Sequence, residues 1–180
     1  MTRAIVWFRQ DLRLSDNSAL FNACQQCDEL IPLFIDDSVD ENISQSVSAL
    51  GSASRAWLHH SLKSLNADLV AENSKLILRQ GKALDVLKAV IAETEATYVY
   101  WNRCYEPEIR ERDELIKTTL KQSVTVQSFK GNLLREPWEG LKQDGTPYRV
   151  FTPYWKALTK DYVLTKPCLL YTSPSPRDRG

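Results

Sequence analysis

The chain has 180 residues, 43% of them hydrophobic and 26% charged, which is the composition of an ordinary globular protein with its own core. Lysine plus arginine and aspartate plus glutamate number 23 each, so no net charge draws the chain to nucleic acid or to a membrane surface. The four cysteines are unevenly spaced, no apolar segment reaches the roughly 20 residues that cross a bilayer, and the N-terminus lacks a signal-peptide pattern. We therefore expect a cytoplasmic protein with reduced cysteines, and we expect a monomer.

Strand-like and helix-like segments alternate from the N-terminus as far as Phe129. Five β-branched or aromatic segments predict strands, and the first four are nearly continuous in apolar character, as strands covered on both faces are. The predicted strands are 3–8, 29–35, 75–79, 97–101 and 124–129. Apolar residues at helical spacing predict helices at 18–27, 52–73, 83–93 and 108–120.

Polar residues with short side chains precede two of these helices and are suited to cap them. Asp16 or Asn17 is available to cap the first helix, and Ser52 or Ser54 to cap the second. The second helix also carries four leucines on one stripe, which is typical of an amphipathic helix. These leucines are Leu58, Leu62, Leu65 and Leu69.

The repeated strand–helix–strand order predicts an α/β fold, a five-stranded parallel Rossmann-like sheet with helices on both faces. After Phe129 the sequence becomes rich in Gly and Pro, and a further short helix is predicted to begin at Pro153. We interpret this later segment as the start of an inter-domain linker. The predicted organisation is therefore an α/β domain over 1–131 followed by a linker over 132–167.

The last residues, "CLLYTSPSPRDRG", differ from the rest of the chain. The segment from Cys168 to Asp178 resembles the translation of a transposase adapter that is used in sequencing libraries. The alternative is an unstructured Ser/Pro-rich linker, which the composition by itself favours. We expect residues 168–180 to be foreign and the native sequence to be interrupted near Pro167.

Charged residues follow the first predicted strand directly, in the segment "VWFRQDLRLSDN". In an open parallel sheet, ligands bind beyond the carboxyl ends of the strands, and this loop leaves the first strand there. The alternative is a salt-bridged loop that caps the next helix, because structural ion pairs are common. The loop residues concerned are Arg9, Asp11, Arg13, Asp16 and Asn17.

The segment "YEPEIRERD" after the fourth strand predicts a helix whose first residue is Pro107. Arg110 and Arg112 fall near its N-terminus, where the helix dipole disfavours cations. The arginines therefore need acidic partners or an anionic ligand. Glu106 and the Asp36–Asp37 pair are candidate partners, and a polar rim around a planar anionic ligand is the functional alternative.

Several common motifs are absent or incomplete. The sequence has neither G-x-G-x-x-G nor a P-loop, and Cys24 and Cys27 form an isolated pair inside a predicted helix. His59 and His60 are adjacent, so they point to different sides of a helix and do not share a metal. Cys104 has no histidine near it in sequence that would act as a base. We predict no metal site and no covalent catalysis.

Four ordered segments resemble the DNA photolyase/cryptochrome family, and the resemblance covers residues 3 to 167. They are "VWFRQDLRLSDN" at the first strand, "SRAWLHHSL" in the long helix, "YWNRCYEPEIRERD" after the fourth strand and "GTPYRVFTPYWKA" in the linker. Within this family the chain is most similar to class I cyclobutane pyrimidine dimer photolyases. The charged loop Arg9–Asn17 corresponds to the opening signature of the family.

The resemblance implies a light-harvesting role. In this family the N-terminal α/β domain holds an antenna pigment, and a helical C-terminal domain holds FAD and binds damaged DNA. Light energy passes from the antenna to the reduced flavin, which donates an electron that splits the dimer. We expect the helical domain to lie outside this chain, so no catalytic residue is assigned and the chain by itself is expected to be inactive.

The resemblance also implies which residues hold the antenna pigment. Deazaflavin-binding members use the end of the second strand, an arginine near the start of the long helix and the loop after the fourth strand. Here those positions are Ile35, Asp36, Asp37, Arg55, Cys104, Tyr105, Glu106, Arg110 and Arg112. Folate-binding members carry an Asn-Glu pair where this chain has Glu108-Ile109. The resemblance therefore favours 8-hydroxy-deazaflavin over methenyltetrahydrofolate, with an empty or flavin-filled site as the alternative.

Three other interpretations compete with a photolyase antenna domain. A cryptochrome blue-light receptor of the same family is the first, because the two differ mainly outside this segment. A stand-alone nucleotide-binding module is the second, although the segment "GTPYRVFTPYWK" serves no purpose in a self-contained binder. A purely structural α/β domain is the third, and it leaves the charged strand ends unexplained.

Overall fold

The computed structural model describes residues 1–40, 51–133, 135–142 and 144–160. These residues form two compact units, which we describe separately. Unit 1 is residues 1–131, and unit 2 begins at Asn132. The segment predicted to be foreign, 168–180, lies outside the described residues, so its origin stays a prediction.

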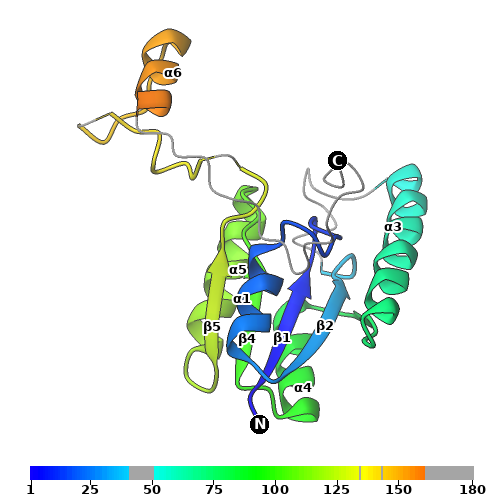
Figure 1. The fold of residues 1–180 in the computed structure, drawn as a ribbon. Coiled ribbons are helices and arrows are strands. Elements are labelled where there is room, and N and C mark those ends of the chain that lie inside the picture. Colours follow the sequence, from blue (N-terminus) through cyan, green and yellow to red (C-terminus); the bar gives the residue numbers. More distant parts are fainter. Residues whose placement is uncertain (41–50, 134, 143, 161–180) are drawn as a thin grey trace, which may run out of the picture. The chain divides into compact units, whose positions relative to one another are not determined.

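Unit 1 is built on a five-stranded parallel sheet (Figure 1). The strands are β1 (Arg3–Phe8), β2 (Glu29–Asp36), β3 (Ile77–Gln80), β4 (Tyr98–Asn102) and β5 (Thr125–Phe129). All neighbouring pairs are parallel, and the order across the sheet is β3-β2-β1-β4-β5. The predicted fold is confirmed, although β3 begins at Ile77 rather than at residue 75. The chain reverses its direction across the sheet between β1 and β4, and such a switch point is where open α/β sheets bind ligands.

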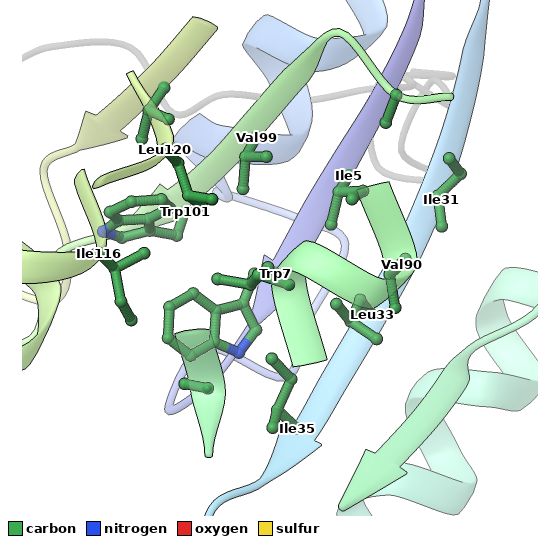
Figure 2. Close-up of a cluster of buried hydrophobic side chains, with 14 residues drawn as sticks. Ile5, Trp7, Ile31, Leu33, Ile35, Val90, Val99, Trp101, Ile116 and Leu120 are labelled. Carbon is green, nitrogen blue, oxygen red and sulfur yellow. The ribbon is translucent and has the colours of Figure 1, made fainter. Parts of the chain in front are cut away.

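Helices cover both faces of this sheet, as predicted. They are α1 (Ser18–Gln26), α3 (Ser52–Ala71), α4 (Ala83–Thr94) and α5 (Pro107–Leu120). Strand β1 alternates between the two faces: Val6 and Phe8 pack with residues of α1 and α3, whereas Ile5 and Trp7 pack with residues of α4 and α5. Figure 2 shows this second core, in which the Trp7 and Trp101 rings meet edge to face with their centroids 5.7 Å apart.

Helix α3 differs from its prediction at its cap, and its leucine stripe is buried along part of its length only. Its N-cap is Gly51, without a side-chain hydrogen bond, so the expectation that a serine caps it is wrong. Leu65 and Leu69 are buried, but Leu58 and Leu62 are only half-buried. The predicted leucine stripe therefore contacts the core through its C-terminal half only, because the N-terminal turns extend beyond the ends of the strands.

The end of unit 1 depends on a glycine. A Cβ atom on Gly131 would lie 2.1 Å from the carbonyl oxygen of Arg103, so no other residue fits there without movement of the backbone. The Gly131 N–H also donates a hydrogen bond to the Tyr105 hydroxyl at 3.2 Å. The chain that leaves β5 is thus held close to the segment that leaves β4.

Unit 2 contains one described helix, α6 (Phe151–Lys160). It begins at Phe151 rather than at the predicted Pro153, because proline needs no N–H partner anywhere in the first turn of a helix. None of its residues is buried, and its aromatic side chains Phe151 and Trp155 stack on each other with ring centroids 6.0 Å apart.

Candidate functional site

A cavity of about 780 Å³ opens at the carboxyl ends of β1 and β2. Its walls come from these strand ends, from the first turns of α3 and from the segment between β4 and α5. The lining includes Trp7, Arg9, Ile35, Asp36, Asp37, Arg55, Trp57, Cys104 and Arg112. The cavity therefore lies at the carboxyl edge of the sheet, the edge at which open α/β sheets bind ligands, beside the switch point between β1 and β4.

Most of the residues that the family resemblance implies for an antenna pigment line this cavity. Ile35, Asp36, Asp37, Arg55, Cys104 and Arg112 line it, and so does Arg9 of the charged loop. Three of the selected residues, Tyr105, Glu106 and Arg110, do not line it, so the cavity gives no support to a ligand contact for them. Glu106 instead accepts hydrogen bonds from Gln10 Nε2 at 2.9 Å and from the Tyr105 N–H at 3.0 Å.

Two arginines and two aspartates form a charge network beside the cavity. Arg112 pairs with Asp37 and, at 2.9 Å, with Asp113, which also pairs with Arg9. The Arg9 side chain is only 8% exposed, and a buried cation needs such partners. The sequence analysis offered two explanations for the arginines at the start of α5, an anionic ligand or ion pairing with Glu106 or the Asp36–Asp37 pair. Ion pairing is confirmed for Arg112. Arg110 is exposed and pairs with neither Glu106 nor any other acidic residue that the structure describes.

The same two arginines also contact an aromatic ring. The guanidinium carbon of Arg9 lies 4.8 Å from the ring centroid of Trp7, and that of Arg112 lies 5.1 Å from it. Both distances are within the range of cation–π attraction. Trp7 thus fixes the positions of two cations at the cavity, a role that sequence reasoning missed because the residue belongs to an apolar strand.

Burial shifts the pKa of two titratable groups that line the cavity, Asp37 and Cys104. Burial raises the pKa of the Asp37 carboxyl, and the neighbouring Arg112 guanidinium opposes this shift. Burial also raises the pKa of the Cys104 thiol to about 11, against the opposing effect of Arg9. A thiol of this kind is not ionised at neutral pH, which agrees with the prediction that Cys104 is not a nucleophile.

The charged loop is held by a buried asparagine that sequence reasoning missed. Asn102, the last residue of β4, donates hydrogen bonds from Nδ2 to Asp11 and, at 2.8 Å, to Asn17 Oδ1. Asn102 Oδ1 accepts from the Ala19 N–H at 3.0 Å, and Asn17 caps α1 by accepting from the Leu20 N–H at 3.0 Å. The sequence contains one signal that could have identified Asn102, because it is the only polar amide at the end of the apolar segment "TYVYWN".

The rest of the charged loop is exposed. Arg13 donates to the backbone oxygens of Ser15 and Asp16, and Asp16 has a positive φ of 49°. The two alternatives for this loop, a ligand-binding loop and a structural loop that caps the next helix, therefore each hold for a different residue. Asn17 caps the following helix, as the structural interpretation predicts, whereas Arg9 lines the cavity.

Two buried N–H groups beside the cavity have no partner within the described part of the chain. They are Trp7 Nε1 and Arg9 Nε, and both belong to residues that line the cavity. The nitrogen edge of Trp7 faces Ile35, another lining residue (Figure 2). Buried donors normally have acceptors, and both of these atoms are shielded from the open space of the cavity.

The described residues provide neither a metal site nor a membrane-spanning helix. No group of three or more His, Cys, Asp or Glu side chains there is arranged to hold a metal ion. No helix in the same part of the chain combines the length and the apolar character that a membrane span needs.

Comparison with known proteins places these features in a family. The family model described as DNA photolyase matches residues 4–174, and thus ends inside the segment that we expect to be foreign. A deoxyribodipyrimidine photo-lyase of Agrobacterium fabrum is 43% identical over 155 residues, which are 86% of this chain and 31% of the relative. Cryptochrome-2 of Arabidopsis thaliana is 36% identical and aligns with 86% of this chain and 25% of its own length. The chain thus spans about a third or less of these two relatives.

Solved structures show the same similarity. A class III photolyase from Agrobacterium tumefaciens has a TM-score of 0.78 and 42% identity, with 87% of this chain and 31% of that chain covered. An archaeal photolyase from Sulfolobus tokodaii, solved with two FAD molecules, has a TM-score of 0.75 and 25% identity over 92% of this chain and 36% of that chain. The first of these is a class III enzyme, so the expected similarity to class I gains no support. The family match and the shared fold show that this chain belongs to the DNA photolyase family.

Proposed function

We propose that unit 1 is the light-harvesting domain of a deoxyribodipyrimidine photolyase and that the 780 Å³ cavity holds its antenna chromophore. The observation that carries the proposal is the position of this cavity at the strand ends, between apolar ring faces and paired charges. Planar ligands need both features, because apolar walls bind the ring and polar groups at its edge fix its orientation.

The residues present fit such a chromophore. Trp57 lines the cavity with 74% of its surface exposed, so a flat ring that stacks on it would remove apolar surface from water. Ile35 supplies a second apolar wall, and Arg112 with Asp37 supplies polar edge groups. When bound, the chromophore supplies absorption of light, and the residues of this chain orient it and shield it from water.

The proposed chromophore is 8-hydroxy-deazaflavin rather than methenyltetrahydrofolate. The support is the sequence Glu108-Ile109, where folate-binding members carry an Asn-Glu pair. Arg112 lies at the cavity and gives an anionic ring a cation. A flavin is the alternative, because the archaeal photolyase from Sulfolobus tokodaii was solved with two FAD molecules, which implied a novel light-harvesting cofactor in that protein.

The proposed activity of the whole protein is light-driven repair of cyclobutane pyrimidine dimers in DNA. FAD and the DNA-binding surface would belong to the part of the relatives that this chain does not cover. The higher identity to the photolyase than to the cryptochrome supports repair over signalling. The chain by itself is expected to restore no dimer-containing DNA under light, and restoration by the purified chain would contradict this assignment.

Titration of the full chain with 8-hydroxy-deazaflavin and with methenyltetrahydrofolate tests the proposal, with absorbance shift as the measurement. We expect deazaflavin to bind more tightly than folate. Arg112→Ala and Trp57→Ala are each expected to weaken binding about tenfold, since each removes one contact of roughly 1 to 1.5 kcal/mol. Arg110→Ala is the matched control, because Arg110 lies on the same helix outside the cavity. Tighter binding of folate would reject the deazaflavin assignment, and binding of neither ligand, nor of FAD in the same titration, would reject the antenna site.

A further inference from the structure

Three basic side chains from different segments lie close together beside the edge strand β5, on the face of the sheet that α5 covers (Figure 1). Arg103 follows β4, Lys117 lies in the last turn of α5, and Lys121 is the C-cap of that helix. Burial lowers the pKa of the Lys117 ammonium, and the like charges of Lys121 and Arg103 lower it further. The chain has no net charge, but positive charge is concentrated here.

Two of these basic side chains meet at Ser128 of β5. The Ser128 hydroxyl oxygen accepts hydrogen bonds from Arg103 at 3.2 Å and from Lys117 Nζ at 3.3 Å. A serine hydroxyl has two lone pairs and one O–H, so both of its acceptor positions are occupied and only the O–H remains. Within the described part of the chain, this O–H has no acceptor. The half-buried hydroxyl of Ser128 is therefore a donor that is available to a ligand.

The two lysines also have no acidic partner among the residues that the structure describes. Asp113 lies one turn before Lys117 on α5, but it already pairs with two arginines at the 780 Å³ cavity. The Lys117 ammonium has three N–H donors and uses one of them, on Ser128. The remaining donors of Lys117 and those of Lys121 thus add to the available O–H of Ser128.

We propose that these four residues, Arg103, Lys117, Lys121 and Ser128, form a basic cluster that binds a phosphate group. A phosphate group presents several acceptor oxygens and negative charge. It therefore suits two lysines without carboxylate partners and a hydroxyl with an unused O–H. Two sources supply this chemistry, a free phosphoanion and the backbone of a nucleic acid, and the experiment separates them.

The basic cluster is separate from the proposed antenna site. None of its residues lines the 780 Å³ cavity, or a second cavity of about 450 Å³ that residues of α3 and β3 line. The larger cavity opens at the ends of β1 and β2, whereas Ser128 belongs to β5, at the edge of the sheet order β3-β2-β1-β4-β5. The inference therefore goes beyond the proposed function and does not depend on a chromophore.

The experiment is a titration of the isotope-labelled full chain with inorganic pyrophosphate and, separately, with a short undamaged DNA duplex. Two-dimensional NMR at matched ionic strength follows the backbone amide signals. We expect at least one of the two probes to shift the signals of Ser128, Lys117 and their sequence neighbours in a saturable manner. If DNA is the ligand, its affinity falls as salt increases, because binding releases counterions.

Four variants locate the effect. Lys117→Gln is expected to weaken binding at least about fivefold, since it removes a charge-assisted contact, and with DNA to reduce the salt slope by about 1. Ser128→Ala is expected to weaken binding about threefold, and Ser128→Thr to restore it, because threonine keeps a hydroxyl and suits a strand. Lys63→Gln is the matched control, because Lys63 is an exposed lysine of α3 outside the basic cluster. Circular dichroism checks that the variants keep their secondary structure.

The outcomes identify the source of the phosphate and also test the basic cluster itself. A shift with pyrophosphate that Lys117→Gln weakens, and no shift with DNA, identifies a free phosphoanion. Tighter binding of DNA, with a smaller salt slope in Lys117→Gln, identifies a nucleic acid backbone. If neither probe moves the signals of Ser128 and Lys117, or if binding is unchanged in Lys117→Gln, the site is rejected. An equal loss in Lys63→Gln would assign the effect to net charge and would also reject the site.

Discussion

Asn102 connects three segments of unit 1 through a single side chain. It bonds to the charged loop at Asp11, to the helix cap Asn17 and to the first turn of α1 at Ala19. Its partners are polar groups in a largely buried environment, and each loses its bond if the amide is removed. This residue therefore determines the position of the loop that carries Arg9 into the cavity.

We predict that Asn102→Ala lowers the free energy of unfolding by about 2 to 4 kcal/mol, because it leaves several buried polar groups without partners. Urea denaturation followed by circular dichroism measures this change. Asn22→Ala is the control, since the Asn22 side chain makes one bond, to the Ser18 carbonyl at 2.8 Å, and is half-buried. Equal losses in the two variants would show that the network has no special role.

The Cys104 thiol provides a second prediction at this scale. Its pKa is raised from 9.0 to about 11 by burial, so the thiolate fraction at pH 8 falls about 100-fold relative to an ordinary cysteine. Iodoacetamide should therefore alkylate Cys104 at least about 100-fold more slowly in the native chain than in urea. Alkylation rates are measured by peptide mass spectrometry. A native rate close to the rate in urea would contradict both the burial and the raised pKa.

Helix α3 is anchored to the sheet at one end and borders the cavities at the other. Leu65 and Leu69 are 1% and 4% exposed, whereas Leu58 and Leu62 are half-buried beside open space. The two ends of one helix therefore serve different purposes. The C-terminal half supplies stability, and the N-terminal half supplies cavity walls, including Trp57 and Arg55.

A pair of leucine variants tests this division. Leu65→Ala is expected to cost about 2 to 5 kcal/mol of unfolding free energy, the usual loss for a fully buried leucine. Leu62→Ala should cost less than about 1.5 kcal/mol, because its side chain is already partly solvated. Both are measured by urea denaturation without ligand. Similar losses would show that the N-terminal half of α3 is packed as firmly as the C-terminal half.

At the scale of the whole molecule, the two compact units have different properties. The described lining residues of both cavities belong to unit 1. Unit 2 exposes large apolar side chains, namely Trp138, Val150, Phe151 and Trp155. Such surfaces are usually covered by another part of a protein, and the relatives extend well beyond the length of this chain.

We predict that a chain ending at Gly131 keeps the ligand affinity of the full chain, within about twofold, and unfolds in one cooperative transition. The physical reason is that every strand of the sheet and both cavities lie within residues 1–131. Absorbance titration and thermal circular dichroism are the measurements. A loss of binding in the shortened chain, with its secondary structure intact, would show that residues after Gly131 contribute to the site.

The sequence by itself determined the fold and predicted the edge of the sheet at which the cavity opens. Continuous apolar strands such as "RAIVWF" and alternating helices specify a parallel sheet, because local hydrophobic periodicity reflects which faces are buried. Charges at the strand ends then indicate the binding edge, since parallel strands end on one side of a sheet. The family resemblance, which the comparisons confirm, depended on the same segments.

Only the tertiary structure decided which of the selected residues meet. Arg110 and Arg112 are equivalent in the sequence, but the rotation of α5 places Arg112 at the cavity and leaves Arg110 exposed. Trp7 belongs to an apolar strand and Asn102 directly follows another, and their polar contacts depend on partners far away in the sequence, such as Arg112 and Asp11. The leucine stripe of α3 indicated one apolar face, but which of its leucines are buried depends on how far the strands extend beneath the helix. These are long-range properties, and local periodicity carries no information about them.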